Sequence, residues 1–246
     1  MIKVRRMLAV VSQNRPLIIV TVRLIFIAGV FFTASVGMPF TNARNMRIHP
    51  PLTILVAQEN GWTALKTDDG ILFIWNREGL HFTLSIKGND IRPMNDPDHI
   101  FFVVDGLVFQ IQSLPISNFA PDAKKKKLDD KAILLAHQDW ESKFIEGMLG
   151  TKLTVQSAGE KLRNGGDVLL WGFDMPKEPA SDAKKQMYLT VVSKDYVILL
   201  NGVVNERASE PTVRQFLLDT IATLKFSPDR IDVKKLQESI RKSGQP

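Results

Sequence analysis

Four histidines are the residues of this chain best suited to bind a metal, and they are His49, His81, His99 and His137. Protein zinc sites place two ligands close together in the chain, as in H-x3-H or H-E-x-x-H, so that both reach one ion. Neither spacing occurs here. Two of the four, His81 and His99, lie on predicted strands that could be neighbours. Ordinary surface or cross-strand histidines are nevertheless the better interpretation, and we predict no metal site.

A nucleophilic active site is also not predicted. The serine-hydrolase motif G-x-S-x-G is absent. His137, Asp139 and Ser142 share one predicted helix, but residues two and five positions apart point to different sides of a helix. The chain contains no cysteine, which excludes disulfides, thiolate metal ligands and thiol nucleophiles.

Two pairs of adjacent carboxylates, Asp68-Asp69 and Asp129-Asp130, raise the question of acid–base catalysis. Glycoside chemistry needs two carboxylates that face each other across a cleft, whereas these pairs fit a turn and the first turn of a helix. The phosphate-binding motifs G-x-G-x-x-G and G-x-x-x-x-G-K-[ST] are missing. We therefore predict no catalytic residue, no cofactor-binding residue and no cofactor.

The net charge of +6 is concentrated at one end of the chain. Residues 1–43 contain five basic and no acidic side chains, and residues 44–246 carry a net charge of only +1. Nucleic-acid binding needs a clustered excess of Lys and Arg, so a nucleic-acid partner is not predicted. The one dense basic cluster, Lys124–Lys127, could contact anionic lipid headgroups or an acidic partner. The alternative is a solvated connector, because Asp122, Asp129 and Asp130 flank the cluster.

The N-terminal segment predicts export. MIKVRR precedes residues 24–43, which run for twenty positions without a charge. A basic start, an apolar block and small residues at its end describe a signal peptide, with exits at Ser35-Val36-Gly37 or Thr41-Asn42-Ala43. The same length also fits a transmembrane anchor, and translation could begin at Met7. A core helix of a cytosolic protein is disfavoured because such a helix normally has a polar stripe.

Strands predominate after Gly61. WTALK and ILFIW are joined by TDDG, and HIFFVVD and LVFQIQS meet at Asp105-Gly106, so both pairs read as hairpins. LHFTLSI alternates apolar and polar residues, as a strand with one buried face does. TKLTVQ, DVLLWGFD and MYLTVVSKDYVILLNG add strands, the last of them either one bent strand or two.

Three helices are predicted, over residues 129–149, over residues 211–224 and after Ser227-Pro228. The first has a predicted apolar stripe and ends at Gly150, and the second starts after an N-cap at Ser209. The third directs Val233, Leu236 and Ile240 inward and its basic residues outward. The stripe of the first helix consists of Ile133, Ala136, Trp140, Phe144 and Met148.

Tight turns imply antiparallel pairing, and strands in runs with helices set apart indicate an α+β fold. We expect an antiparallel sheet of about 7–8 strands covered by two or three helices and preceded by an N-terminal signal or transmembrane helix. The expected organisation is a signal peptide or membrane anchor over 1–43, a lead-in linker over 44–60, and a single domain over 61–246. The lead-in contains PPLTILVAQ, which reads as a first strand, an apolar segment packed on the sheet or a second cleavage exit.

The last third of the chain contains the strand segment MYLTVVSKDYVILLNG, the amphipathic helix PTVRQFLLDTIATL and the following LKFSP. In these segments it resembles the PsbP-like sandwich family. It implies an antiparallel sheet with flanking helices and a non-enzymatic accessory or interaction role outside the cytoplasm. No functional residue follows from it.

The sequence therefore predicts an exported, non-enzymatic binding protein that lies in the periplasm or is anchored in the inner membrane facing the periplasm. Its expected partner is an unidentified protein or envelope component, and the membrane itself if the N-terminal segment is retained. The alternative is a carrier of a small apolar ligand held between sheet and helices. An enzyme with a site assembled from distant residues is a third possibility.

Overall fold

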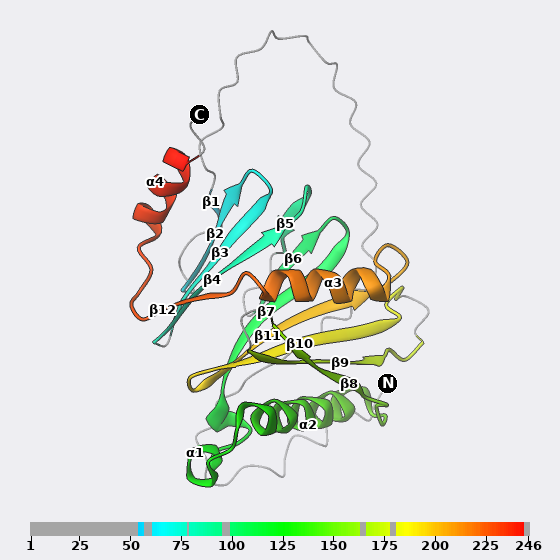
Figure 1. The fold of residues 1–246 in the computed structure, drawn as a ribbon. Helices are drawn as coiled ribbons and strands as arrows, with labels where there is room; N and C mark the ends of the chain where they lie inside the picture. Colours follow the sequence, from blue (N-terminus) through cyan, green and yellow to red (C-terminus); the bar gives the residue numbers. More distant parts are fainter. Residues whose placement is uncertain are drawn as a thin grey trace, which may run out of the picture.

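The computed structural model describes residues 54–56 and 61–243, except 78, 95–98, 163–165 and 178–180. The N-terminal helix expected before the domain lies outside these residues. Within them the fold is α+β, with every strand pair antiparallel, as predicted (Figure 1). No helix in the described part of the chain is long and apolar enough to cross a bilayer.

The strands form two sheets where the sequence predicts one. The smaller sheet has the order β1-β2-β3-β4-β12. Its strands are β1 (Ile54–Val56), β2 (Trp62–Thr67), β3 (Gly70–Arg77), β4 (Leu80–Lys87) and β12 (Lys225–Ser227). The last strand comes from the far end of the chain, since Phe226 is aligned with Phe82. Nearby, the Asn76 side chain both donates to and accepts from the backbone of Ile231, at 2.9 Å in each case.

The larger sheet has seven strands in the order β5-β6-β7-β11-β10-β9-β8. They are β5 (Ile91–Pro93), β6 (Ile100–Val104), β7 (Leu107–Pro115), β8 (Gln156–Lys161), β9 (Asp167–Asp174), β10 (Lys185–Ser193) and β11 (Tyr196–Val204). The predicted hairpin at Asp105-Gly106 is confirmed. Of the two interpretations of MYLTVVSKDYVILLNG, two strands is the right one, and they pair on either side of Lys194-Asp195. The predicted strand 151–156 is wrong, because strand pairing starts only at Gln156.

The helices lie on different faces of these sheets (Figure 1). Helix α2 packs on β9 and β10 of the larger sheet, α3 packs on its other face against β10 and β11, and α4 packs on β2 of the smaller sheet. A short connector precedes α2. The helical segments are η2 (Ile116–Asn118), α1 (Ala123–Lys126), α2 (Asp130–Leu149), α3 (Glu210–Ile221) and α4 (Val233–Ser243).

The main core lies between the two sheets and beneath α3. Its largest fully buried side chains are aromatic, and they come from both sheets: Phe73, Phe82, Phe102 and Phe109. A second apolar layer lies between α2 and the larger sheet, and a third, small one lies under α4. The molecule is thus layered, with α4 and α2 as its opposite outer layers (Figure 1).

Local chemistry accounts for the helix boundaries. Asp129 caps α2 by accepting the backbone N–H of Ala132, and Ser209 caps α3 by accepting that of Thr212. Gly150 ends α2 in the left-handed conformation, with φ of 67°. Close packing of α3 depends on Gly202, because a Cβ there would lie 2.7 Å from Cγ1 of Val213.

The predicted apolar stripe of α2 is rotated from the face that is buried. The structure buries Ile133, as expected, but the fully enclosed side also carries His137 and Glu141. Met148 is 41% exposed, although the stripe places it inward. The reason is that the spacing rule selects apolar residues, and this helix turns two ionisable residues toward the sheet.

Candidate functional site

A row of four large side chains crosses the face of the seven-stranded sheet that bears α2. Gln110 of β7 is aligned with Asn201 of β11, Asn201 with Tyr188 of β10, and Tyr188 with Trp171 of β9. Directly opposed residues of neighbouring strands project to the same face, so the four lie side by side. All are buried, with between 1% and 8% of each exposed. The row changes from apolar at β9 to polar at β11 and β7.

Hydrogen bonds and ring stacking hold the centre of this row. The Asn201 side chain bonds with the Tyr188 side chain. It also accepts from Nε2 of Gln186 at 3.2 Å and donates Nδ2–H to the carbonyl of Met187 at 3.3 Å. The Trp171 and Tyr188 rings stack with centroids 4.0 Å apart and planes 7° apart. Tyr188 is therefore fixed both at its ring and at its hydroxyl.

Helix α2 places two ionisable side chains over this row. His137 and Glu141 are one turn apart, and the exposed fractions are 0% and 4%. Leu134 and Ile145 on the same helix join the apolar layer around them. The His137 ring meets that of Phe119 edge-on, with centroids 5.1 Å apart. We call His137, Glu141, Trp171, Tyr188 and Asn201 the α2 cluster.

Burial sets the protonation of the α2 cluster. Loss of hydration raises the pKa of Glu141 from 4.5 to about 7 and lowers the pKa of His137 from 6.5 to about 4. Burial, together with the nearby Glu141 charge, raises the pKa of Tyr188 well above 10. Near neutral pH the imidazole is therefore uncharged, the phenol is protonated, and the carboxyl is divided between its two forms.

Several polar atoms of the α2 cluster have unused hydrogen-bonding capacity. Both ring nitrogens of His137, Oε2 of Glu141 and Nε1 of Trp171 are buried without a hydrogen-bond partner among the described residues. Each such atom costs about 1–3 kcal/mol relative to a satisfied one. These unpartnered donors and acceptors can bind a small polar group. Without such a group, Glu141 can instead retain a proton.

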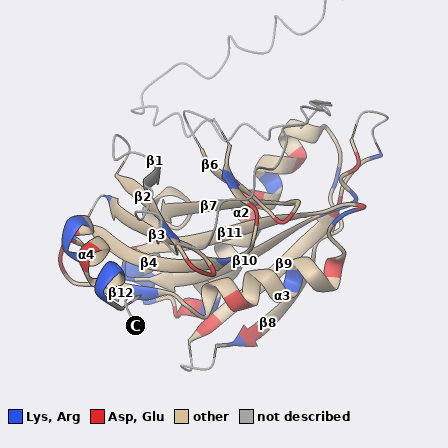
Figure 2. Ribbon diagram, turned by 90° about the horizontal axis from the view of Figure 1, so that it is seen from above, with Lys and Arg blue, Asp and Glu red and all other residues tan. Residues whose placement is uncertain are grey.

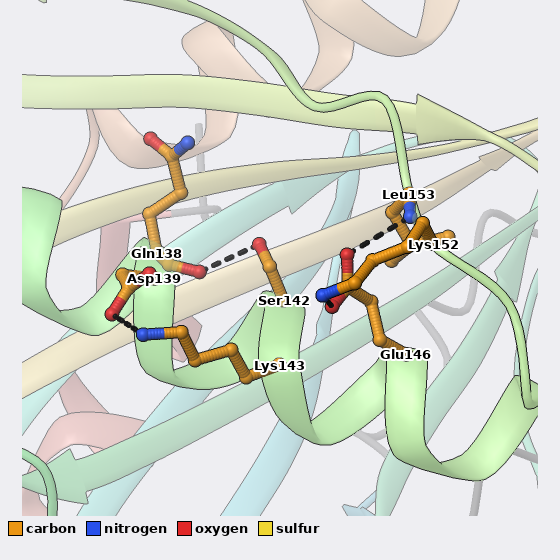
Figure 3. Close-up of polar contacts among 7 residues, drawn as sticks. All are labelled: Gln138, Asp139, Ser142, Lys143, Glu146, Lys152 and Leu153. Carbon is orange, nitrogen blue, oxygen red and sulfur yellow. Dashed lines mark hydrogen bonds and ion pairs between the residues drawn. The ribbon is translucent and has the colours of Figure 1, made fainter.

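The C-terminal half of α2 is tied down by contacts on its outer side (Figure 3). Glu146 accepts from Nζ of Lys152 at 2.8 Å and from the backbone N–H of Leu153 at 3.0 Å. These bonds lower the pKa of Glu146, and the same carboxylate raises the pKa of Lys152. They fold the segment after Gly150 back against the helix, next to the start of β8.

Further contacts in the same view stay within α2. Lys143 pairs with Asp139 at 2.7 Å, and Oγ of Ser142 donates to the carbonyl of Gln138 at 2.6 Å. Ser142 is buried and Asp139 is exposed. The enclosed His137 and the exposed Asp139 lie on different sides of the helix, as predicted.

The other residues with predicted roles lie apart from the α2 cluster. His81 belongs to β4 of the smaller sheet, whereas His99 precedes β6 of the larger one. Within the described residues, no group of three His, Cys, Asp or Glu side chains could hold a metal. His49 lies outside the described residues.

The paired carboxylates have local structural roles. Asp69 lies at the β2–β3 turn and pairs with Lys87 at 3.4 Å, and Asp129 caps α2. In the basic cluster Lys124–Lys127, Lys124 pairs with Asp195 at 2.8 Å. All four lysines are exposed.

Sequence reasoning missed the α2 cluster. The available signal was a carboxylate at Glu141, four residues after His137, on a helix side that also carries Leu134 and Ile145. Trp171 was expected in the core, where it lies. Its contact with Tyr188 depends on strand register, which one strand's pattern does not give.

Comparison with models of known protein families gives no match. Comparison with curated proteins finds no significant match either.

Proposed function

We propose that this chain is an exported, non-enzymatic binding protein of the bacterial envelope, which acts in the periplasm or from the outer face of the inner membrane. Its partner is a protein or another envelope component. The basic start and the uncharged block over residues 24–43 support export. The resemblance of the last third of the chain to the PsbP-like family supports an accessory role outside the cytoplasm.

One observation carries the non-enzymatic part of the proposal. The groups of the α2 cluster with altered pKa values are enclosed: His137 is 0%, Glu141 4% and Tyr188 3% exposed. A catalytic acid or base must come within hydrogen-bond reach of its substrate. Here α2 and its aromatic neighbours stand between these groups and solvent, which suits a fixed structural or binding element better than turnover.

Export is tested with a reporter enzyme that is active only outside the cytoplasm, fused after residue 60. We expect activity from the natural segment. In the control, Ile25→Lys and Ile27→Lys place charges in the apolar block, each at a cost of about 2.5–3.5 kcal/mol for membrane insertion, and activity should fall to background. Equal activity from both fusions, or only background activity from the fusion with the natural segment, would refute export.

A second candidate function is that of a carrier for a small ligand held between α2 and the larger sheet. The unpartnered atoms of His137, Glu141 and Trp171 favour it, because they offer donors and an acceptor inside an apolar layer. Such a site fits a ligand with an apolar body and one polar group.

Native mass spectrometry of the protein purified from its host tests the carrier. A reproducible additional mass that is lost in the variant Trp171→Phe would support it. A bare polypeptide in both preparations would count against it. The intact mass from the same spectra also shows whether the N-terminal segment is removed.

A further inference from the structure

Helix α4 has two chemically opposite sides. Val233, Leu236 and Ile240 pack with Leu65 and Ile74 on the outer face of the smaller sheet. At 100° per residue, Lys234, Lys235, Arg241 and Lys242 fall on the side away from the sheet. All four are exposed, and Glu238 is the acidic residue among them. The inward side explains why the helix docks, but not why the outward side is basic.

Two lysines of α4 lie at positions where a positive charge is unfavourable for the helix. Lys234 and Lys235 lie in the first turn of α4, where the helix dipole disfavours positive charge. Neither forms an ion pair with any described residue. Over residues 225–243 there are six basic and three acidic side chains, a local net charge of +3 in a chain that is nearly neutral after residue 43. Figure 2 shows these basic residues together at one side of the molecule.

The chain connects this side of the molecule to the apolar N-terminal block. Strand β1 begins at Ile54 and pairs with β2, the strand against which α4 packs. Eleven residue steps separate Ala43 from Ile54, so the connection spans at most about 40 Å even when fully extended. This connection contains Arg44 and Arg47 and no acidic residue. A membrane that holds the block is therefore within reach of the α4 layer.

We propose that the basic outer side of α4 lies on the anionic phospholipid headgroups of the membrane that holds the N-terminal segment. The inference rests on the proposed function, in its membrane-anchored form. Lysines and arginines near an anionic bilayer each contribute about five-fold to binding. The layer opposite, α2, would then face away from the bilayer.

The cluster Lys124–Lys127 provides an internal comparison. It lies by α1, at the other end of the molecule from α4 (Figure 1). Lys124 is paired with Asp195, and the cluster is flanked by acidic residues. It is thus a charge-matched control, distant from the proposed membrane contact.

The test uses the full chain in lipid nanodiscs and the absence of native cysteine. Ser239→Cys on α4 and Ser117→Cys on η2 each take an environment-sensitive fluorophore at an exposed position. Discs of phosphatidylcholine alone are compared with discs that contain increasing phosphatidylglycerol. We expect lipid contact at position 239, increasing with phosphatidylglycerol and lost in 1 M salt, and none at position 117.

Variants that remove lysine charges then measure how much these charges contribute to the membrane contact. Lys234→Gln with Lys235→Gln should lower the apparent contact constant at position 239 about 30-fold, whereas Lys125→Gln with Lys126→Gln should change it less than two-fold. Contact that is independent of phosphatidylglycerol, or equal at positions 117 and 239, would overturn the proposal. Loss of contact in discs together with binding of α4 to an acidic protein would also overturn it, in favour of a protein partner.

The export reporter and the lipid contact at position 239 distinguish failure of the proposed function from failure of the α4 proposal. If the export reporter stays inactive while position 239 still responds to phosphatidylglycerol, the basic surface stands and the envelope role falls. If the reporter is exported but position 239 does not respond, only the α4 proposal falls.

Discussion

Replacing Glu141 with Gln should change the free energy of unfolding in a pH-dependent way. The difference between the variant and the unmodified protein should favour the variant more at pH 8 than at pH 4.5. Glu141 is buried among apolar and aromatic side chains beneath α2. Because burial raises the pKa of its carboxyl from 4.5 to about 7, the folded protein retains a proton that the unfolded chain releases. The variant has a neutral amide at every pH and removes this linkage.

The sign and size follow from the two pKa values. Stability linked to the retained proton is fully present below pH 4.5 and is lost as the pH rises through about 7. Over that interval the loss amounts to about 3 kcal/mol in the free energy of unfolding. The difference between Glu141→Gln and the unmodified protein should therefore shift by about 3 kcal/mol in favour of the variant between pH 4.5 and pH 8.

His137 gives the opposite dependence. Burial lowers the pKa of its imidazole from 6.5 to about 4, so the linked stability is present above pH 6.5 and lost as the pH falls through 4. The two linkages oppose each other between pH 4.5 and 6.5 and nearly cancel. The stability of His137→Gln should therefore fall as the pH rises from 4.5 to 6.5, because only the Glu141 linkage remains. The stability of Glu141→Gln should rise over the same interval, because only the His137 linkage remains.

Urea unfolding followed by circular dichroism, at half-unit steps from pH 4 to 8, measures these differences. Glu238→Gln, an exposed change on α4, is the matched control and should follow the unmodified protein throughout. If Glu141→Gln also runs parallel to the unmodified protein between pH 4.5 and 8, the carboxyl is hydrated or paired in the folded state. The description of the α2 cluster would then be wrong.

Three further predictions concern packing and caps, and urea midpoints check each of them. Trp171→Ala should lower the free energy of unfolding by about 3–5 kcal/mol, because it removes a buried ring stacked on Tyr188. Tyr188→Phe should lower it by only about 1 kcal/mol, because it keeps the ring and loses the bond to Asn201. Equal losses in the two variants would contradict this. Gly202→Ala should cost about 1–3 kcal/mol, since its Cβ would displace α3, and an unchanged midpoint would show that α3 has room to move. Asp129→Ala should cost about 1 kcal/mol through loss of the α2 cap, while Asp129→Asn, which can still cap, should cost less.

Local signals in the sequence predicted the hairpins and helix ends well. Asp69-Gly70 and Asp105-Gly106 join strands as expected, and Ser209 and Gly150 lie at the predicted helix boundaries. Each of these features depends on a few adjacent residues, whose backbone preferences a sequence shows directly.

The number of sheets could not be predicted in the same way. A three-residue strand such as β12 has no periodicity to detect, and its partner β4 lies some 140 positions earlier. The division of the strands between two sheets is settled by which apolar faces meet across the core. That is a property of the whole chain.

The α2 cluster shows a second limit. An apolar stripe of Ala136, Trp140 and Phe144 reads as the buried face, but these residues are only partly buried, while His137 and Glu141 are enclosed. Pattern rules direct charged residues outward because burial of a charge is costly. A change in protonation reduces that cost, and no pattern of apolar residues records it.

The pairing of β12 with β4 also orders events in time. Leu80–Lys87 is synthesised about 140 residues before its neighbour Lys225–Ser227 and before the Ile231 backbone that bonds to Asn76. Contacts so distant in sequence form late. A nascent chain must therefore keep the edge of β4 unpaired until Lys225–Ser227 has been synthesised. A ribosome stalled before residue 225 would present that open edge to other chains, a route to aggregation that the finished protein closes.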